Sequence, residues 1–270
     1  MDLLSSVLRR PVASDDKYSR GVVGFVTGSI DFPGAAILGV TAAIRTGIGM
    51  VRWIGPATVG KMLVEVRPEV VLMNGRVQCW VLGSGVSSDG VDEQATNIAV
   101  ALAQPGFAII DAGAIDFVNF SEIKTRCVLT PHAGELERLL TRLGEPLSRA
   151  AIETDPITAA KLAATLTKQT ILLKGNVTTI ADPHGGIWQT PPATPALATA
   201  GSGDVLAGIL GALVAANDGP IQAGDIELSQ IALAGALLHA RAGALASKDG
   251  PVAALDVAEA IRTVVGDFLA

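Results

Sequence analysis

The sequence is poor in cysteine, in aromatic side chains and in basic runs. Its 270 residues include two cysteines, Cys79 and Cys127, each inside an apolar run, so we expect buried thiols rather than a disulfide or a metal pair. The 20 Lys and Arg residues are outnumbered by 26 Asp and Glu, and the net charge is −6. A surface of this charge is a poor partner for nucleic acid or for an anionic membrane.

Signals for export or membrane insertion are also missing from the sequence. The longest uncharged segment, 185–203, is interrupted by three prolines and is unsuited to span a bilayer. The N-terminus carries Asp2 where a signal peptide carries basic residues, and its apolar stretch ends at Arg9. We therefore expect a cytoplasmic protein.

Apolar segments rich in valine and isoleucine alternate with alanine- and leucine-rich segments of helical period. The predicted strands are Val22–Thr27, Met50–Ile54, Val70–Met73, Cys79–Leu82, Phe107–Asp111, Cys127–Thr130, Thr170–Lys174 and Thr178–Ala181. The predicted helices are Gly34–Thr46, Asp89–Ala103, Ala133–Leu143, Pro156–Thr167, Asp204–Ala216, Leu228–Ala246 and Val252–Phe268. This alternation predicts one α/β domain over residues 1–270, with a mostly parallel sheet between two helical layers.

Ligands of such sheets bind beyond the carboxyl ends of the strands, and the strongest motif is a glycine-rich loop that runs into a helix. It spans Ala198–Gly208 and contains Gly201, Ser202, Gly203 and Asp204. Glycines let the backbone approach an anion, and the unpaired N–H groups of a first helical turn hold negative charge. Asp204 is then either the N-cap of the helix or a base that takes a proton from a substrate hydroxyl.

Several other predicted strands end in residues that can bind ligands. A glycine pair that includes Gly85 follows the predicted strand at 79–82, and Asp111 ends the strand at 107–111. His132 and Glu135 begin a helix directly after the strand at 127–130. Lys174 closes a fourth strand and offers an ammonium group to phosphate, with a solvated hairpin lysine as the alternative. His132 and Glu135 have a simpler interpretation too, a helix start with an acid in its first turn.

Other known patterns fail on individual residues. The segment 55–62 resembles a phosphate-binding loop, but Met62 stands where a magnesium-binding hydroxyl is needed and Pro56 removes an N–H donor. Hydrolase and zinc motifs are missing from the sequence. Of the remaining histidines, His184 lies in a predicted turn and His239 inside an apolar helix, so neither is expected at a functional site.

In this order, the elements resemble the ribokinase-like superfamily and, more closely, the ADP-dependent NAD(P)H-hydrate dehydratases. The matching segments cover most of the chain: 17–21, 28–36, 43–49, 82–85, 111–112, 129–135, 173–175 and 199–204. Two positions depart from the family pattern, Ser84 where the family usually has proline and Gly113 where it usually has aspartate. The match begins near the N-terminus, so we expect no epimerase domain ahead of it.

The resemblance implies a ribokinase-like three-layer α/β/α fold and a repair reaction. Hydrated cofactor, (6S)-NADHX or NADPHX, would be dehydrated to NADH or NADPH with ADP as co-substrate, releasing AMP and phosphate. Asp204 would be the base, and the loop of Gly201, Ser202 and Gly203 would hold the transferred phosphoryl group. The hydrate would contact Ala35, Ala36, Gly85, His132 and Asp204, and the nucleotide Lys174, Gly175, Asn176, Val177, Thr178 and Gly203.

Three further expectations accompany the resemblance. A Mg²⁺ ion would bridge the phosphates, with Glu135 as its outer ligand, and the protein would be a homo-oligomer, a tetramer by the family pattern. Two rival functions remain. One is a small-molecule kinase of the same fold, of the hydroxymethylpyrimidine type, and the other is a nucleotide-sensing protein without turnover.

Overall fold

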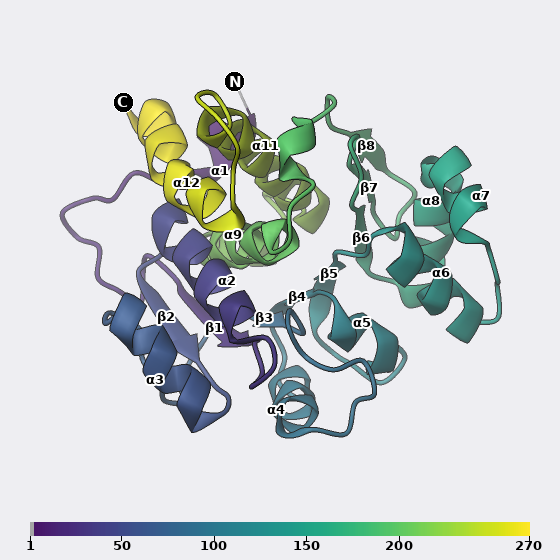
Figure 1. Cartoon of the computed structure of the whole chain (residues 1–270), viewed down its shortest axis with the longest axis horizontal. Helices are drawn as coiled ribbons and strands as arrows, with labels where there is room; N and C mark the ends of the chain where they lie inside the picture. The colour runs from purple at the N-terminus through teal and green to yellow at the C-terminus, as the bar shows by residue number, and fades with distance from the viewer. Residues whose placement is uncertain (1–2) are drawn as a thin grey trace.

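The computed structural model describes residues 3–270, so Asp2 of the N-terminal prediction lies outside the described part. Eight strands form one sheet in the order β2-β1-β3-β4-β5-β6-β7-β8, parallel up to β6 and antiparallel for the last two (Figure 1). The strands are β1 (Val22–Val26), β2 (Met50–Trp53), β3 (Cys79–Leu82), β4 (Phe107–Ile110), β5 (Arg126–Leu129), β6 (Thr170–Leu173), β7 (Thr179–Ala181) and β8 (Ile187–Gln189).

Seven of the eight predicted strands are confirmed, and the prediction for Val70–Met73 is wrong. Only Val71 pairs there, in a single bridge to Arg52. The guanidinium of Arg52 donates to the carbonyls of Met73 and Asn74, and these bonds hold the segment as a loop. Strand β8 was not expected, because it is a three-residue edge strand in which no residue is fully buried.

Helices cover both faces of the sheet. One face carries α2 (Pro33–Thr46), α9 (Ser202–Ala216) and α11 (Leu228–Ala246), with α12 (Ala254–Leu269) and α1 (Leu3–Val7) packed outside them. The other face carries α4 (Glu93–Leu102), α5 (Gly113–Phe117), α6 (Ala133–Arg142) and α8 (Pro156–Thr167). The remaining helices are α3 (Ala57–Val66), α7 (Arg149–Thr154), α10 (Asp218–Ala223) and the short 3₁₀ helix η1 (Pro195–Leu197).

All seven predicted helices exist; Pro156–Thr167 and Leu228–Ala246 have the predicted ends, and the other five are shifted at one or both ends. Helix α4 begins four residues late because Asp92 is its N-cap and accepts a hydrogen bond from the Ala95 N–H at 2.8 Å. Helix α9 begins at Ser202, two residues before the predicted start.

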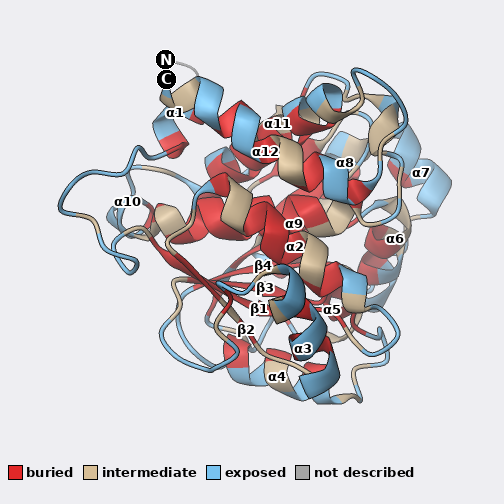
Figure 2. Cartoon of the chain, turned by 60° about the vertical axis from the view of Figure 1, so that its left-hand side comes forward, coloured by how far each residue is buried: buried red, intermediate tan, exposed pale blue. Residues whose placement is uncertain are grey.

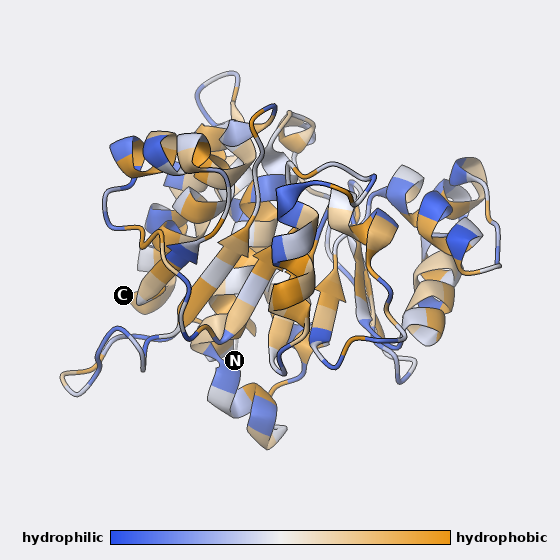
Figure 3. Ribbon diagram, turned by 90° about the horizontal axis from the view of Figure 1, so that it is seen from below, coloured by the Kyte–Doolittle hydropathy of each residue, from blue (hydrophilic) through white to orange (hydrophobic). Residues whose placement is uncertain are grey.

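The core consists of two apolar clusters, one on each side of the mostly hydrophobic strands (Figure 3). Helix α9 is the most buried helix in the view of Figure 2. Glycines let it lie close to its neighbours: a Cβ on Gly208 would stand 2.1 Å from the carbonyl oxygen of Gly39 in α2, and one on Gly211 would stand 2.2 Å from Val81. This packing fixes the N-terminus of α9 at the carboxyl edge of the sheet. Cys79 and Cys127 are buried free thiols, as expected.

Helix α1 and the segment after it lie on the same side of the molecule as the C-terminus (Figure 1). The guanidinium of Arg10 donates to the backbone carbonyl of Ala270 at 2.9 Å, and α1 packs on α11 and α12. Within residues 3–270, the helices are all too short or too polar to cross a membrane.

Candidate active site

Four neighbouring strands deliver polar side chains to one network at the carboxyl edge of the sheet. Asp111, the residue after β4, is its centre and is 2% exposed. Its carboxylate accepts from the Ser84 hydroxyl at 2.8 Å, from the Thr130 hydroxyl at 2.7 Å and from the Lys174 ammonium at 2.8 Å. Glu135 adds a second carboxylate, 3.6 Å from the same ammonium. Each strand end therefore contributes a charge or a donor to one buried ion pair.

The network places the Lys174 ammonium against the first turn of α9. A Cβ on Gly203 would lie 3.5 Å from Nζ, although the two residues come from different parts of the chain. Burial alone would lower the pKa of Lys174, but the charges of Asp111 and Glu135 outweigh it and raise that pKa. The side chain is 21% exposed, so it is not the solvated hairpin lysine of the alternative interpretation. A permanent positive charge faces the predicted anion loop.

The first turn of α9 is the anion loop itself, and here one alternative is wrong. The N-cap is Gly201, with φ 88°, a left-handed conformation that glycine adopts without strain. Asp204 is the third residue of the helix, and within residues 3–270 its carboxylate makes no hydrogen bond. Asp204 is therefore not a cap, and its carboxylate stays available to a substrate.

Burial raises the pKa of Asp204 from 3.8 to about 7, with the nearby charge of Asp111 acting in the same direction and that of Lys174 opposing it. A carboxyl group with this pKa exchanges protons near neutral pH, which is the range that general base catalysis requires. The arrangement combines a base, a cation and a set of helix N–H donors around one point.

His132 and Glu135 form a capping box at the start of α6, as their simpler interpretation predicts. Nδ1 of the His132 ring accepts from the backbone N–H groups of Gly134 and Glu135. The carboxylate of Glu135 accepts from the backbone N–H of His132 at 2.8 Å. The ring remains 56% exposed at the same edge, next to Lys174, whose N–H pairs with Pro131. Nε2 of the ring lies 3.5 Å from Oε1 of Glu135, and the exposed part of the ring remains accessible to a ligand.

The geometry gives no support to Glu135 as a magnesium ligand. One of its oxygens is engaged by the His132 N–H and lies near the Lys174 ammonium, a cation that already fills the neighbouring space. Within residues 3–270, no group of three histidine, cysteine, aspartate or glutamate residues is placed to hold a metal ion. These residues do not fit a metal site built by the protein alone.

Three of the residues expected to contact the hydrate, Gly85, Ala35 and Ala36, lie where α2 begins. A Cβ on Gly85 would lie 2.6 Å from Cβ of Ala35, so the loop after β3 touches the first turn of α2 only because position 85 is glycine. The Gly28 N–H donates to the Ser84 carbonyl at 2.7 Å, so the loops after β1 and β3 are joined and form one wall beside the start of α2. Ala36 is fully buried behind it. The wall joins Gly85 to the Asp111 network through the adjacent Ser84.

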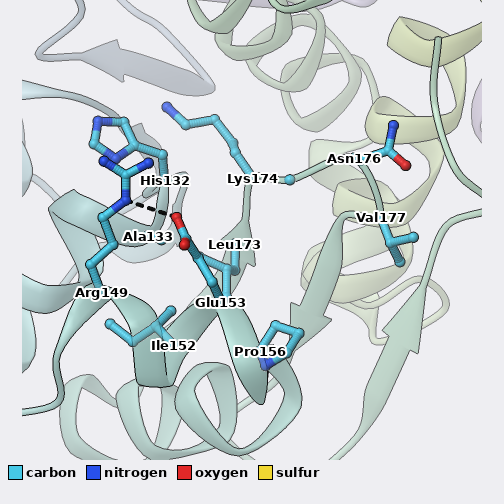
Figure 4. A pocket seen from close by; sticks show the side chains of 11 residues that line it. His132, Ala133, Arg149, Ile152, Glu153, Pro156, Leu173, Lys174, Asn176 and Val177 are labelled. Carbon is cyan, nitrogen blue, oxygen red and sulfur yellow. Dashed lines mark hydrogen bonds and ion pairs between the residues drawn. The ribbon is translucent and has the colours of Figure 1, made fainter. Parts of the chain in front are cut away.

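Four of the six residues expected to contact the nucleotide border a cavity of about 620 Å³, and Thr178 and Gly203 lie outside its lining. It is lined by His132, Lys174, Gly175, Asn176, Val177 and six further residues, and Figure 4 shows the Arg149–Glu153 ion pair on its wall. Asn176 also anchors the segment that leads to the anion loop, because its side chain donates to the Ala193 carbonyl and its own carbonyl accepts from the Ala193 N–H. The Thr178 N–H donates to the Thr190 hydroxyl.

Both departures from the family pattern have a local explanation. A Cβ on Gly113 would lie 2.2 Å from the carbonyl oxygen of Val86, so this backbone leaves no room for an aspartate. Ser84 supplies a hydroxyl to Asp111 that a proline would lack. His239, which the sequence placed only in an apolar helix, lies 3.2 Å from the Ser202 hydroxyl at the anion loop. A single histidine inside an alanine-rich helix carries no sequence signal for such a contact.

We expect His132→Ala and His132→Asn to differ. Alanine removes the cap acceptor of α6 and should lower the free energy of unfolding by about 1 kcal/mol, whereas asparagine is a good N-cap and should keep it. If the exposed ring contacts the hydrate, both variants lose hydrate binding and keep ADP binding. Thermal melts and separate titrations of the two ligands measure this. Normal hydrate binding by the asparagine variant would assign His132 to capping alone.

The sheet order and the glycine-rich turn into a central helix define a ribokinase-like α/β protein. A ribokinase-like superfamily protein from Enterococcus faecalis superposes with a TM-score of 0.82 and 25% identity, covering 99% of this chain and 94% of the other. The ADP/ATP-dependent NAD(P)H-hydrate dehydratase of Bacillus subtilis, co-crystallised with ATP/Mg²⁺, superposes with a TM-score of 0.84 at 24% identity, covering 98% and 96%.

The sequence of residues 23–264 matches the NAD(P)H-hydrate dehydratase family, and the chain belongs to that family. A bifunctional NAD(P)H-hydrate repair enzyme of Corynebacterium glutamicum is 37% identical, over 93% of this chain and 48% of the relative. An ADP-dependent (S)-NAD(P)H-hydrate dehydratase of Xanthomonas campestris is 30% identical, over 90% and 86%. The chain thus spans about half the length of the bifunctional relatives it matches.

Proposed function

We propose that this chain dehydrates (6S)-NADHX or NADPHX to NADH or NADPH with ADP as co-substrate. The observation that carries the proposal is the meeting of Asp204, the N-terminus of α9 and the Lys174 ammonium at one point. A base beside an anion-binding turn suits phosphoryl transfer to a hydroxyl. Because the chain belongs to the dehydratase family, we take this hydroxyl to be the one on the hydrated nicotinamide ring.

The reaction balances in two steps. Asp204 takes the proton of the ring hydroxyl, and the hydroxyl oxygen attacks the terminal phosphorus of ADP. AMP leaves. The N–H groups of the first turn of α9 and the Lys174 ammonium stabilise the charge on the transferred group. The bond between the ring carbon and the phosphate oxygen then breaks with help from the ring nitrogen's electrons. Loss of a proton from the adjacent carbon restores the double bond and releases phosphate.

Magnesium enters this proposal only with the nucleotide. Mg²⁺ usually keeps several waters and binds substrate phosphates with few protein ligands. The lack of a fitting ligand set among residues 3–270 is therefore compatible with a metal–nucleotide complex as the incoming species. The ion would supply charge neutralisation on the phosphates. Lys174 supplies the positive charge that belongs to the chain itself.

A homo-oligomer is part of the proposal. The exposed apolar side chains Met62, Val66, Leu72, Met73 and Val100 belong to α3, α4 and the loop before β3. Leu72 and Val100 line a cavity of about 480 Å³ together with Trp53 and Trp80. Apolar surface of this kind favours protein association, and sedimentation equilibrium of the intact chain tests it.

The deciding experiment incubates the intact chain with hydrated NADH or NADPH and either ADP or ATP. Recovery of the dihydronicotinamide absorbance, with equal amounts of AMP and free phosphate from ADP, supports the proposal. A stable phosphorylated product would instead identify a kinase of the same fold. Tight nucleotide binding without any product would identify a nucleotide-sensing protein.

The acid limb of the pH profile should lie near pH 7. Asp204 accepts a proton only as a carboxylate, and its pKa is raised to about 7, so turnover should fall about tenfold per pH unit below that value and level off above it. In Asp111→Asn the limb should move to lower pH, because a negative charge that raises this pKa is removed. Asp225→Asn, an exposed loop carboxylate, is the control and should leave the limb in place. A limb unmoved by Asp111→Asn would contradict the coupling.

A further inference from the structure

His239 is the one buried histidine of the described chain, and it touches the anion loop. It is 8% exposed, whereas His132 and His184 are exposed. Its Nε2 lies 3.2 Å from the hydroxyl of Ser202, which is itself buried at 6% exposure. Histidine and serine come from α11 and α9, so the contact ties the central helix to its neighbour at the end where the anion would bind.

The same face of α11 holds the segment before the loop. Gly235, His239 and Gly243 are spaced four residues apart and therefore lie on one side of the helix. A Cβ on Gly235 would lie 2.4 Å from Leu210 of α9, and one on Gly243 would lie 2.6 Å from Leu197 of η1. Helix α11 thus packs directly on both α9 and η1, with the imidazole between the two glycine contacts.

The sequence of the loop gives its backbone little rigidity of its own. Ser202 stands between two glycines, and Gly201 has the left-handed φ of 88°. Glycine gives up more conformational freedom on folding than other residues, so a Gly-Ser-Gly turn is held in one geometry by outside contacts. A buried hydrogen bond to the serine side chain is a contact of this kind.

The imidazole acts without carrying a charge. Burial lowers the pKa of His239 to about 4; a hydrogen bond with the Ser202 backbone opposes this shift, and the nearby Lys174 ammonium adds to it. The ring is therefore neutral at neutral pH. A neutral ring adds nothing to the attraction of phosphate, so any effect on turnover comes from the hydrogen bond to Ser202.

We propose that His239 is a positioning residue that fixes Ser202, and through it the N–H groups of the anion loop and the carboxylate of Asp204. The inference rests on the proposed function, because the loop must stabilise charge on a transferred phosphoryl group. Groups held in advance for that charge need no reorganisation during the reaction. The role is exerted through Ser202, and the ring itself does not touch the nucleotide.

The test compares His239→Leu, which fills similar space without a hydrogen bond, with His239→Gln, whose amide keeps one. His239→Leu and Ser202→Ala should each lower kcat about 10- to 100-fold, with a smaller change in KM, as expected for misplaced catalytic groups. The double variant should be no worse than either single one, because both remove the same contact. His239→Gln should recover most of the activity. Additive losses, or full activity of His239→Leu, would overturn the proposal.

A second measurement does not depend on turnover. Amide hydrogen exchange of Gly203 and Asp204 should be faster in His239→Leu than in wild type or His239→Gln, while exchange in the strands stays unchanged. Unchanged exchange at the loop would overturn the positioning role even if the chain proved to be a kinase. Faster loop exchange in a chain without dehydratase activity would support the anchor while rejecting the proposed function.

Discussion

Asp204→Asn is expected to lose turnover by about 10²- to 10⁴-fold, the range associated with removal of a general base. Asparagine has almost the same shape as aspartate and cannot accept the hydroxyl proton. Because Asp204 is not the N-cap of α9, the substitution removes no capping bond, and ADP binding should persist. Turnover and ADP titration measure the two effects separately. A fully active asparagine variant would remove Asp204 from the chemistry.

The same variant should be more stable than wild type at alkaline pH. The folded-state pKa of Asp204 is raised from 3.8 to about 7, so the folded protein binds this proton more tightly than the unfolded chain does, and stability falls as pH rises between those values. Asparagine is free of this loss and should gain about 2–4 kcal/mol at pH 8, with no gain below about pH 4. Melting curves at pH 4 and pH 8 test it. Asp225→Asn, at an exposed aspartate, is the control and should show no such gain.

Lys174→Met is expected to be the most destabilising single change at the site. It leaves Asp111, which is 2% exposed, as a buried carboxylate without its cation, a loss of about 3–5 kcal/mol in the free energy of unfolding. ADP affinity should fall about 10- to 100-fold as well, since a charged donor near the anion loop is lost. Denaturant unfolding and ADP titration provide the two numbers, and Lys161→Met, an exposed lysine of α8, is the control.

Two further results separate the charge effect from lost packing. The double variant Lys174→Met with Asp111→Asn should recover part of the stability, because no buried charge remains unpaired. In the single variant the pKa of Asp111 no longer feels the ammonium and rises, so the loss should be larger at pH 8 than at pH 5. A loss that is independent of pH and unchanged in the double variant would contradict the ion-pair account.

The succession of strands and long helices along the chain was predictable because each of these segments shows its own hydrophobic pattern. Buried strands such as Phe107–Ile110 are continuous apolar runs, and Pro156–Thr167 has the helical period and a proline at its first position. The short helices α1, α5, α7 and α10 were missed, since a few residues cannot show a period. Helix α3 has ten residues and was missed for another reason, because its first residues resemble a phosphate-binding loop.

The ligand-binding positions at strand ends could be proposed from sequence, but their partners could not. The sequence placed Lys174 near phosphate, yet its ion pair with Asp111 joins residues 63 positions apart. The contact of His239 with Ser202 spans 37 positions and depends on how α11 crosses α9. Such pairs are set by the packing of whole helices and strands, which local patterns do not contain.

The place of the C-terminus has a consequence for building longer polypeptides from this fold. Arg10 meets Ala270, while α12 begins beside the anion loop, where Ala254 lies close to Gly201, and runs for 16 residues to that end of the chain. At 1.5 Å per residue, its length separates the C-terminus from the loop by about 24 Å. A tag, a reporter or a second enzyme joined at the C-terminus would therefore keep clear of the anion loop. Joining the two ends through a short linker should also permit circular permutation at an exposed loop such as 74–76.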